Sequence, residues 1–158
     1  MIRKKILLLG DFSVGKTSLV RRYVDAAFDD KYLTTIGVKV SKKMFNIGDI
    51  EAEMLIWDIE GSTPQRKISL GYYKGASAAI FVADITRRET VENLKEHINV
   101  FLIENPNAKY VIAHNKSDML NDIARENIVL DENVFLTSAK EDSNVEELFT
   151  RLMKGVLE

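Results

Sequence analysis

Short apolar runs alternate along the chain with segments in which apolar residues recur at helical spacing. The continuous runs at residues 6–9 and 78–83 are typical of strands buried on both faces of a sheet. Residues 38–47 and 52–57 flank a Gly48-Asp49 pair, which predicts a β-hairpin. Two more short strands are predicted at residues 110–113 and 134–136.

Helical spacing is found at residues 16–24, 91–103 and 145–156. Ser143 or Asn144 is the expected N-cap of the last helix. Strands that alternate with helices predict an α/β fold with a mostly parallel six-stranded sheet, one antiparallel edge strand and helices on both faces. No linker or low-complexity tract interrupts the pattern, so we expect one domain over residues 1–158. Ligands bind such sheets at the carboxyl ends of the strands.

Composition narrows the function only by exclusion. The 158 residues are 46% hydrophobic and 29% charged, as in ordinary globular proteins. A net charge of −2 lacks the basic excess of a nucleic-acid binder. The absence of cysteine excludes disulfides, thiolate zinc sites, a cysteine nucleophile and lipid attachment to cysteine in this chain. The first apolar run is too short for a signal peptide or a membrane span, so we expect a cytoplasmic protein. Without cysteine we expect no encoded lipid anchor. We also expect a monomer.

The first predicted strand ends in Gly10-Asp11-Phe12-Ser13-Val14-Gly15-Lys16-Thr17, followed by Ser18. This run matches the pattern G-x-x-x-x-G-K-S/T, in which backbone N–H groups surround phosphate oxygens. Lys16 would reach the β- and γ-phosphates and the Thr17 hydroxyl would bind Mg²⁺, while the following helix directs its positive end at the same anion. A chance match is expected in roughly one chain of this length in a few hundred. The sequence therefore predicts a phosphate-binding loop.

Two later loops also follow predicted strands. They are Asn115-Lys116-Ser117-Asp118 and Ser138-Ala139-Lys140, and each alone would be read as a solvated loop. Together with the phosphate loop they resemble the motifs of the small GTPases of the Ras superfamily, most closely the Rab family. The resemblance covers nearly the whole chain and implies the P-loop NTPase small-GTPase fold, bound GTP or GDP, and Mg²⁺.

The resemblance implies a role in base recognition for these loops. The Asp118 carboxylate would accept hydrogen bonds from guanine N1–H and the exocyclic amine, neither of which adenine offers. Lys116 would lie over the base, and the Ala139 N–H would meet the guanine oxygen, with Asn115, Ser138 and Lys140 completing the two motifs. Phe28 matches the aromatic residue that covers the base edge in this family, with core packing as the alternative.

The resemblance also implies a metal site and two switch segments. Thr17 and Thr35 would bind Mg²⁺ through their hydroxyls, and Asp58 would hold it through a water. Lys16, Thr35 and the Gly61 N–H would act on the γ-phosphate. Residues 28–40 and 59–76 would contact effector and regulator proteins.

The sequence departs from the Rab pattern where hydrolysis is controlled. Ser62 stands where the family has the glutamine that orients the attacking water, next to Glu60 and Pro64. Phe12 and Ser13 replace small residues beside the γ-phosphate. These changes predict a switch that hydrolyses GTP slowly. The alternative is a GTP-bound scaffold with negligible hydrolysis, whereas an ATP-dependent kinase is disfavoured by the guanine-reading loops.

Three further departures concern other surfaces. Val40 replaces one aromatic of the effector-facing trio, beside Trp57 and Tyr72. The segment between Asp118 and Thr137 is several residues shorter than in a typical Rab, so we expect a helix of only a turn or two there. The chain ends without a cysteine-bearing tail, as expected of a prokaryotic Rab-like protein or of a chain trimmed at its C-terminus.

Overall fold

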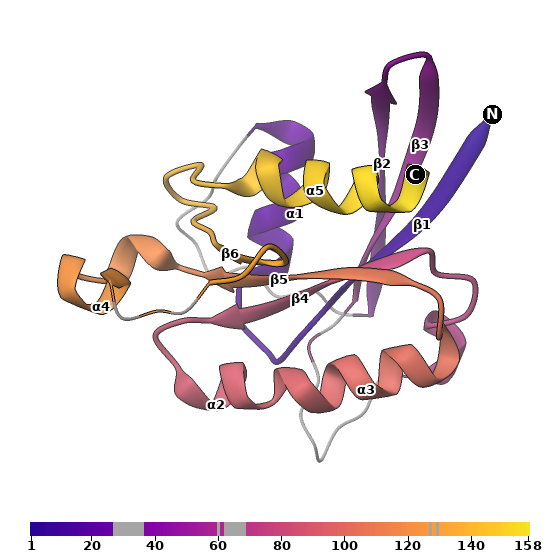
Figure 1. Cartoon of the computed structure of the whole chain (residues 1–158). Coiled ribbons are helices and arrows are strands. Elements are labelled where there is room, and N and C mark those ends of the chain that lie inside the picture. Colours follow the sequence, from indigo (N-terminus) through magenta and orange to yellow (C-terminus); the bar gives the residue numbers. More distant parts are fainter. Residues whose placement is uncertain (27–36, 60, 62–68, 127, 129) are drawn as a thin grey trace.

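A computed structural model of the chain describes residues 1–26, 37–59, 61, 69–126, 128 and 130–158 (Figure 1). Its centre is a six-stranded sheet in the order β2-β3-β1-β4-β5-β6. The strands are β1 (Ile2–Leu9), β2 (Val38–Ile47), β3 (Ile50–Ile59), β4 (Ala78–Asp84), β5 (Lys109–Asn115) and β6 (Val134–Leu136). Only the β2–β3 pair is antiparallel. The predicted α/β fold, with one antiparallel edge strand, is confirmed.

Helices cover both faces of this sheet (Figure 1). They are α1 (Lys16–Asp25), α2 (Arg88–Glu92), α3 (Leu94–Glu104), α4 (Asp122–Glu126) and α5 (Val145–Leu157), with 3₁₀ turns at η1 (Leu70–Tyr72) and η2 (Ser117–Met119). On the α1 and α5 face, Tyr23 stacks on the fully buried Phe149 with 3.9 Å between ring centroids. On the α3 face, Phe101 packs edge-on against Phe81 of β4. Every residue of β4 is buried, because helices lie on both sides of it.

The β2–β3 hairpin confirms the turn predicted at Gly48-Asp49. Gly48 has φ 55°, the left-handed conformation that glycine supplies in two-residue hairpins. The first strand was predicted too short, because it begins at Ile2 rather than Ile6. The extra residues pair in parallel with β3, from Ile2 opposite Ala52 onward. Backbone hydrogen bonds therefore extend the strand on the N-terminal side of its apolar run.

The helices differ from the prediction at two asparagines. The single helix predicted over residues 91–103 is two helices, because a turn at Asn93 separates α2 from α3. Asn144 occupies the N-cap position of α5, but its side-chain amide donates to the Leu136 carbonyl oxygen at 2.8 Å instead of capping the helix.

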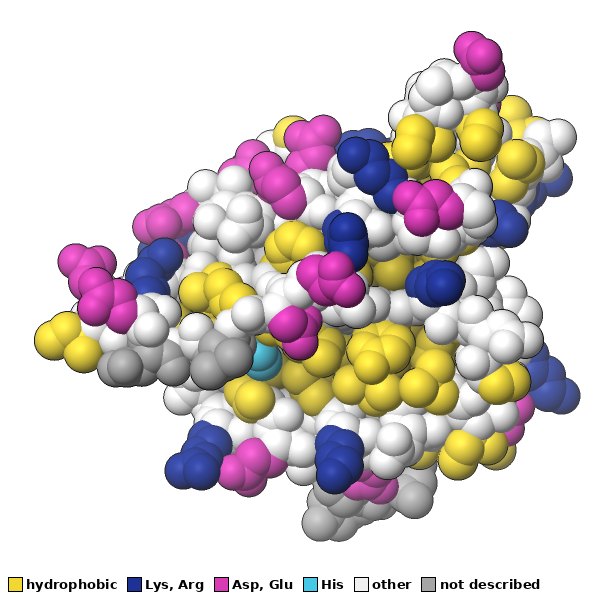
Figure 2. Space-filling model, viewed as in Figure 1, with side chains coloured by type: hydrophobic (Ala, Val, Ile, Leu, Met, Phe, Trp, Pro, Cys, Tyr) yellow, Lys and Arg dark blue, Asp and Glu magenta, His cyan; other side chains and the backbone are white. Residues whose placement is uncertain are grey.

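The helix between the two base-recognition loops is as short as predicted. Helix α4 has five residues and lies beyond the end of the sheet in Figure 1. Figure 2 shows apolar side chains gathered between α3 and α5, where β5 crosses the molecule, and Tyr110 and Ile112 of β5 are only partly buried. Among the described residues, the longest helix has 13 residues, and none is long and apolar enough to cross a membrane.

Candidate functional site

The phosphate loop leaves the carboxyl end of β1 and turns directly into α1. Two of its residues can only be glycine. Gly10 has φ 153° and a Cβ there would lie 2.2 Å from the Val82 carbonyl oxygen. Gly15 has φ 100° and a Cβ would lie 2.2 Å from Asn115 Nδ2. The loop is therefore packed against β4 and against the first base-recognition loop.

Lys16 is the first residue of α1 and is only 6% exposed. Its ammonium donates to the carbonyl oxygens of Gly10 at 3.2 Å and Asp11 at 2.9 Å. Burial lowers the pKa of Lys16 from 10.5 to about 8; Asp58 and Asp11 oppose this shift, and the positive charge of Arg87 adds to it. A cation whose charged form is disfavoured by burial is suited to an anionic ligand, which would restore its charge.

Thr17 and Asp58 meet beside the phosphate loop. The Thr17 hydroxyl lies 2.6 Å from Asp58 Oδ2, and Asp58, near the end of β3, is 1% exposed. Gly61, shortly after Asp58 in the sequence, packs against the phosphate loop: a Cβ there would lie 2.7 Å from both the Cα and the N of Phe12. The structure thus brings together Thr17, Asp58 and Gly61, which come from two separate motifs.

The first base-recognition loop bonds directly to the phosphate loop. Asn115 Nδ2 donates to the Val14 carbonyl at 3.0 Å, and its Oδ1 accepts from the Thr137 hydroxyl at 3.1 Å. Lys116, in the left-handed conformation with φ 66°, donates to the Ser13 carbonyl at 2.9 Å. The loop after β5 is therefore fixed against the phosphate loop through side chains that the motif specifies.

The second base-recognition loop contacts the first one and α1. The Ser138 hydroxyl donates to Asp118 Oδ1 at 2.8 Å and accepts from the Glu141 N–H at 3.0 Å. Arg22 of α1 donates to the Ala139 carbonyl at 2.8 Å, and also to that of Lys140. Sequence reasoning missed Arg22, which lies 117 positions from Ala139 and belongs to no motif.

Sequence reasoning also missed the partners of Asp11. The Asp11 side chain is directed at α3 and its N-terminal turn, where Asn93 Nδ2 donates to Oδ2 at 2.7 Å and His97 Nε2 lies 2.8 Å from Oδ1. All three lie in the loop-to-helix contact, with Asp11 5% and His97 8% exposed. The contact holds the start of the phosphate loop to the helix on the opposite sheet face from α1.

The remaining predicted residues divide into two groups. Ser18 follows Thr17 in the first turn of α1 and is half-buried. Phe28, Thr35, Glu60, Ser62 and Pro64 lie outside the described residues. The roles assigned to those five stay predictions.

Taken together, a phosphate loop, the loop after β5 that bonds to it, and the loop after β6 that bonds to that second loop define a P-loop nucleotide-binding protein. The family model for the Ras family matches residues 5–158. The chain is 34% identical to the GTP-binding protein ypt1 of Schizosaccharomyces pombe, over 98% of this chain and 80% of that protein. It is 35% identical to the Ras-related protein SEC4 of Saccharomyces cerevisiae, over 98% of this chain and 75% of that protein. It is 34% identical to human Ras-related protein Rab-8B, over 97% and 78%. The chain belongs to the Ras family and is a Rab-like small GTPase.

Proposed function

We propose that the chain is a molecular switch that binds GTP or GDP with Mg²⁺ and hydrolyses GTP slowly. The observation that carries the proposal is the contact of the base-recognition loop with the phosphate loop, through Asn115 on Val14 and Lys116 on Ser13. One ligand that carries both a base and phosphates would use both loops at once. The family of the chain supports guanine as that base.

Guanine selectivity is assigned to Asp118, with the Ala139 N–H as a second contact. The Ser138 hydroxyl holds one oxygen of the Asp118 carboxylate at 2.8 Å and so limits its rotation. A carboxylate accepts hydrogen bonds only, so it matches the two donors of guanine and leaves adenine without a partner. Lys140, in the same loop as Ser138 and Ala139, is exposed. Phe28 is assigned to the edge of the base.

The residues at the end of the phosphate loop fit a magnesium ion. Mg²⁺ takes few protein ligands and completes its shell with phosphate oxygens and water. Thr17 and Asp58 supply a hydroxyl and a carboxylate at one point, 2.6 Å apart, and Thr35 is assigned as the third residue. Bound there, the ion would neutralise charge on the β- and γ-phosphates.

Slow turnover is assigned to the residues that replace the Rab pattern. Ser62 is too short to orient a water about 3 Å from the phosphorus in the way a glutamine does. Phe12 adds bulk where an arginine finger would enter, a contact that speeds hydrolysis about 10³–10⁵-fold in other GTPases. Lys16, Thr35 and Gly61 remain the residues assigned to the γ-phosphate. A GTP-bound scaffold with negligible hydrolysis is the second candidate, favoured by the same two substitutions.

The switch role assigns residues 28–40 and 59–76 to effector and regulator proteins. The described part of these segments exposes apolar side chains: Val40 is 44%, Leu70 53% and Tyr72 38% exposed. Exposed apolar side chains in these segments are available to a partner protein.

Two measurements test the proposal. GTP and ATP are competed against fluorescent GDP; ATP binding within about tenfold of GTP, a gap of ~1.4 kcal/mol, would contradict the assignment of guanine. Single-turnover phosphate release then compares the wild type with Ser62→Gln and Phe12→Gly. We expect slow release that each variant partly accelerates. Release as fast as that of an ordinary Rab would refute slow turnover, and no release at all would favour the scaffold.

A further inference from the structure

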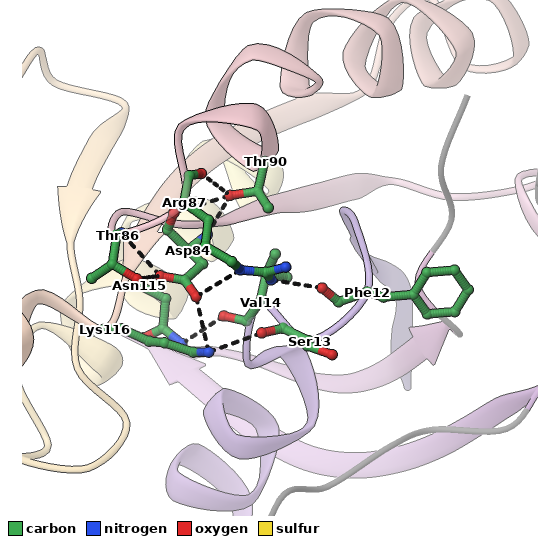
Figure 3. Close-up of polar contacts among 9 residues, drawn as sticks. All are labelled: Phe12, Ser13, Val14, Asp84, Thr86, Arg87, Thr90, Asn115 and Lys116. Carbon is green, nitrogen blue, oxygen red and sulfur yellow. Dashed lines mark hydrogen bonds and ion pairs between the residues drawn. The ribbon is translucent and has the colours of Figure 1, made fainter. Parts of the chain in front are cut away.

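Two cations and one carboxylate form a network beside the phosphate loop (Figure 3). Asp84, the last residue of β4, is 2% exposed. Its Oδ1 accepts from the Thr86 N–H at 2.9 Å and from the Thr86 hydroxyl at 2.6 Å. Its Oδ2 lies 3.0 Å from both Arg87 Nε and Lys116 Nζ. Burial acts to raise the pKa of Asp84, but these hydrogen bonds outweigh it and lower the pKa below 3.8, so the carboxylate is charged at neutral pH.

Arg87 connects this network to the phosphate loop. From its position just before α2, its Nη2 donates to the Phe12 carbonyl at 2.8 Å (Figure 3). Lys116 donates in the same way to the carbonyl of Ser13, and Asn115 to that of Val14. Three successive carbonyls of the loop are thus held by side chains from other elements.

Anchored carbonyls fix the direction of the loop's N–H groups. The carbonyl of one residue and the N–H of the next belong to one planar trans peptide unit and point in opposite directions. The described peptide bonds are all trans. The three anchors therefore direct the N–H groups of Ser13, Val14 and Gly15 away from the anchoring side chains. Successive N–H groups that face one way form an anion-binding concavity.

We propose that Arg87 is a positioning residue of the phosphate site, which holds the Phe12 carbonyl and so directs the Ser13 N–H at the bound phosphates. The inference rests on the proposed nucleotide binding. Motif residues supply the other two anchors, whereas Arg87 belongs to none of the motifs.

The chemistry of arginine suits this position. Its planar guanidinium presents several N–H donors in a fixed fork, so one side chain bonds the Asp84 carboxylate through Nε and the Phe12 carbonyl through Nη2. A lysine carries the same charge on a single nitrogen. Arg87→Lys therefore retains the attraction to Asp84 but loses the fixed second contact.

The test compares Arg87→Ala and Arg87→Lys with a matched control, Arg88→Ala. Arg88 is the next residue; its side chain is 91% exposed and pairs with Glu92 on the surface of α2. Two quantities are measured on full-length protein: the dissociation rate of fluorescent GDP, and the rise in melting temperature that GDP produces. We expect Arg87→Ala to speed GDP dissociation about tenfold and to reduce the GDP-induced rise, because one phosphate donor is no longer held in place. Arg87→Lys should lie nearer to Arg87→Ala than to the wild type, and Arg88→Ala should match the wild type.

A GDP dissociation rate within about twofold of the wild type in Arg87→Ala would overturn the inference. An equal drop in melting temperature with and without GDP, at an unchanged dissociation rate, would also overturn it, because Arg87 would then be only a structural ion pair. If Arg87→Ala does not fold, Arg87→Lys decides by the same rate. Failure of the wild type itself to bind GDP would instead refute the proposed function, which keeps the two failures distinct.

Discussion

The burial of Lys16 links nucleotide binding to pH. In the nucleotide-free protein, burial lowers the pKa of Lys16 from 10.5 to about 8. In the proposed site, bound phosphates would place negative charge beside the ammonium and raise its pKa again. Above about pH 8, binding must therefore take up a proton, and the affinity for GDP must fall as the pH rises.

The size of the effect follows from the two pKa values. The difference between a pKa of about 8 and one of 10.5 corresponds to about 3 kcal/mol. This is the largest change in binding free energy that the titration of Lys16 can cause. If the bound pKa returns to its ordinary value, affinity falls about fivefold between pH 8 and pH 9. For folding without nucleotide the sign is opposite. The cost of burying the ammonium is complete below about pH 8 and disappears toward pH 10.5, so the free energy of unfolding rises across that interval.

Calorimetric titration with GDP and Mg²⁺ measures the proton uptake directly. Titrations between about pH 7 and pH 9, in two buffers of different ionisation enthalpy, should show uptake rising from near zero toward one proton. The lower part of this range is decisive, because guanine keeps its own N1 proton there. Lys154→Gln, which removes an exposed lysine of α5, is the control and should behave as the wild type. Constant affinity across the range without proton uptake would refute the reasoning.

Three further changes test other parts of the site and the sheet. Asp118→Asn should weaken GDP binding at least about tenfold and favour xanthine nucleotides, because an amide donor then faces the xanthine carbonyl; competition binding measures this, and unchanged guanine preference would contradict it. Gly61→Ala should weaken GDP and GTP binding about tenfold, because its Cβ would lie 2.7 Å from Phe12, whereas the control Gly71→Ala meets nothing closer than 3.8 Å and should bind as the wild type. Burial lowers the pKa of His114 below 6.5, so the free energy of unfolding should fall as the pH drops below that value. Urea unfolding at several pH values measures this, and a His114→Phe variant that keeps the same acid sensitivity would rule out His114 as its source.

Strands were predictable where the hydrophobic pattern alone determines them. The bounds predicted for β2 and β6 match the structure, and β4 differs only at its last residue, Asp84. The start of β1 was missed because residues 3–5 are basic, and backbone pairing with β3, not burial, keeps them in the strand. The break at Asn93 was missed for a similar reason. Its side chain bonds Asp11, 82 positions away, and no local pattern reports such a contact.

The same distinction applies to the site. The positions of the phosphate loop and of the two base-recognition loops at strand ends were predictable, because each motif has particular residues at fixed spacing. The side chains that hold those loops in place were not. Arg22 and Arg87 look like ordinary solvated charges in the sequence, yet each bonds a backbone carbonyl of a loop that is 117 and 75 positions away, respectively. Only the fold brings these partners together.

The anchors also explain how the phosphate loop tolerates Ser13. Its φ is 62°, a left-handed conformation that costs a residue with a Cβ about 1–2 kcal/mol relative to glycine. A lone strained residue in a free loop would relax toward a negative φ and turn the neighbouring peptide units with it. Here both adjoining peptide units are fixed from outside, through the Phe12 carbonyl on Arg87 and the Ser13 carbonyl on Lys116. Hydrogen bonds to charged donors contribute about 1.5–3 kcal/mol each, which is enough to hold the strained conformation. The direction of the loop's N–H groups therefore depends on these carbonyl contacts more than on a glycine at position 13, so the loop keeps its left-handed turn with Ser13, where this chain departs from the Rab pattern.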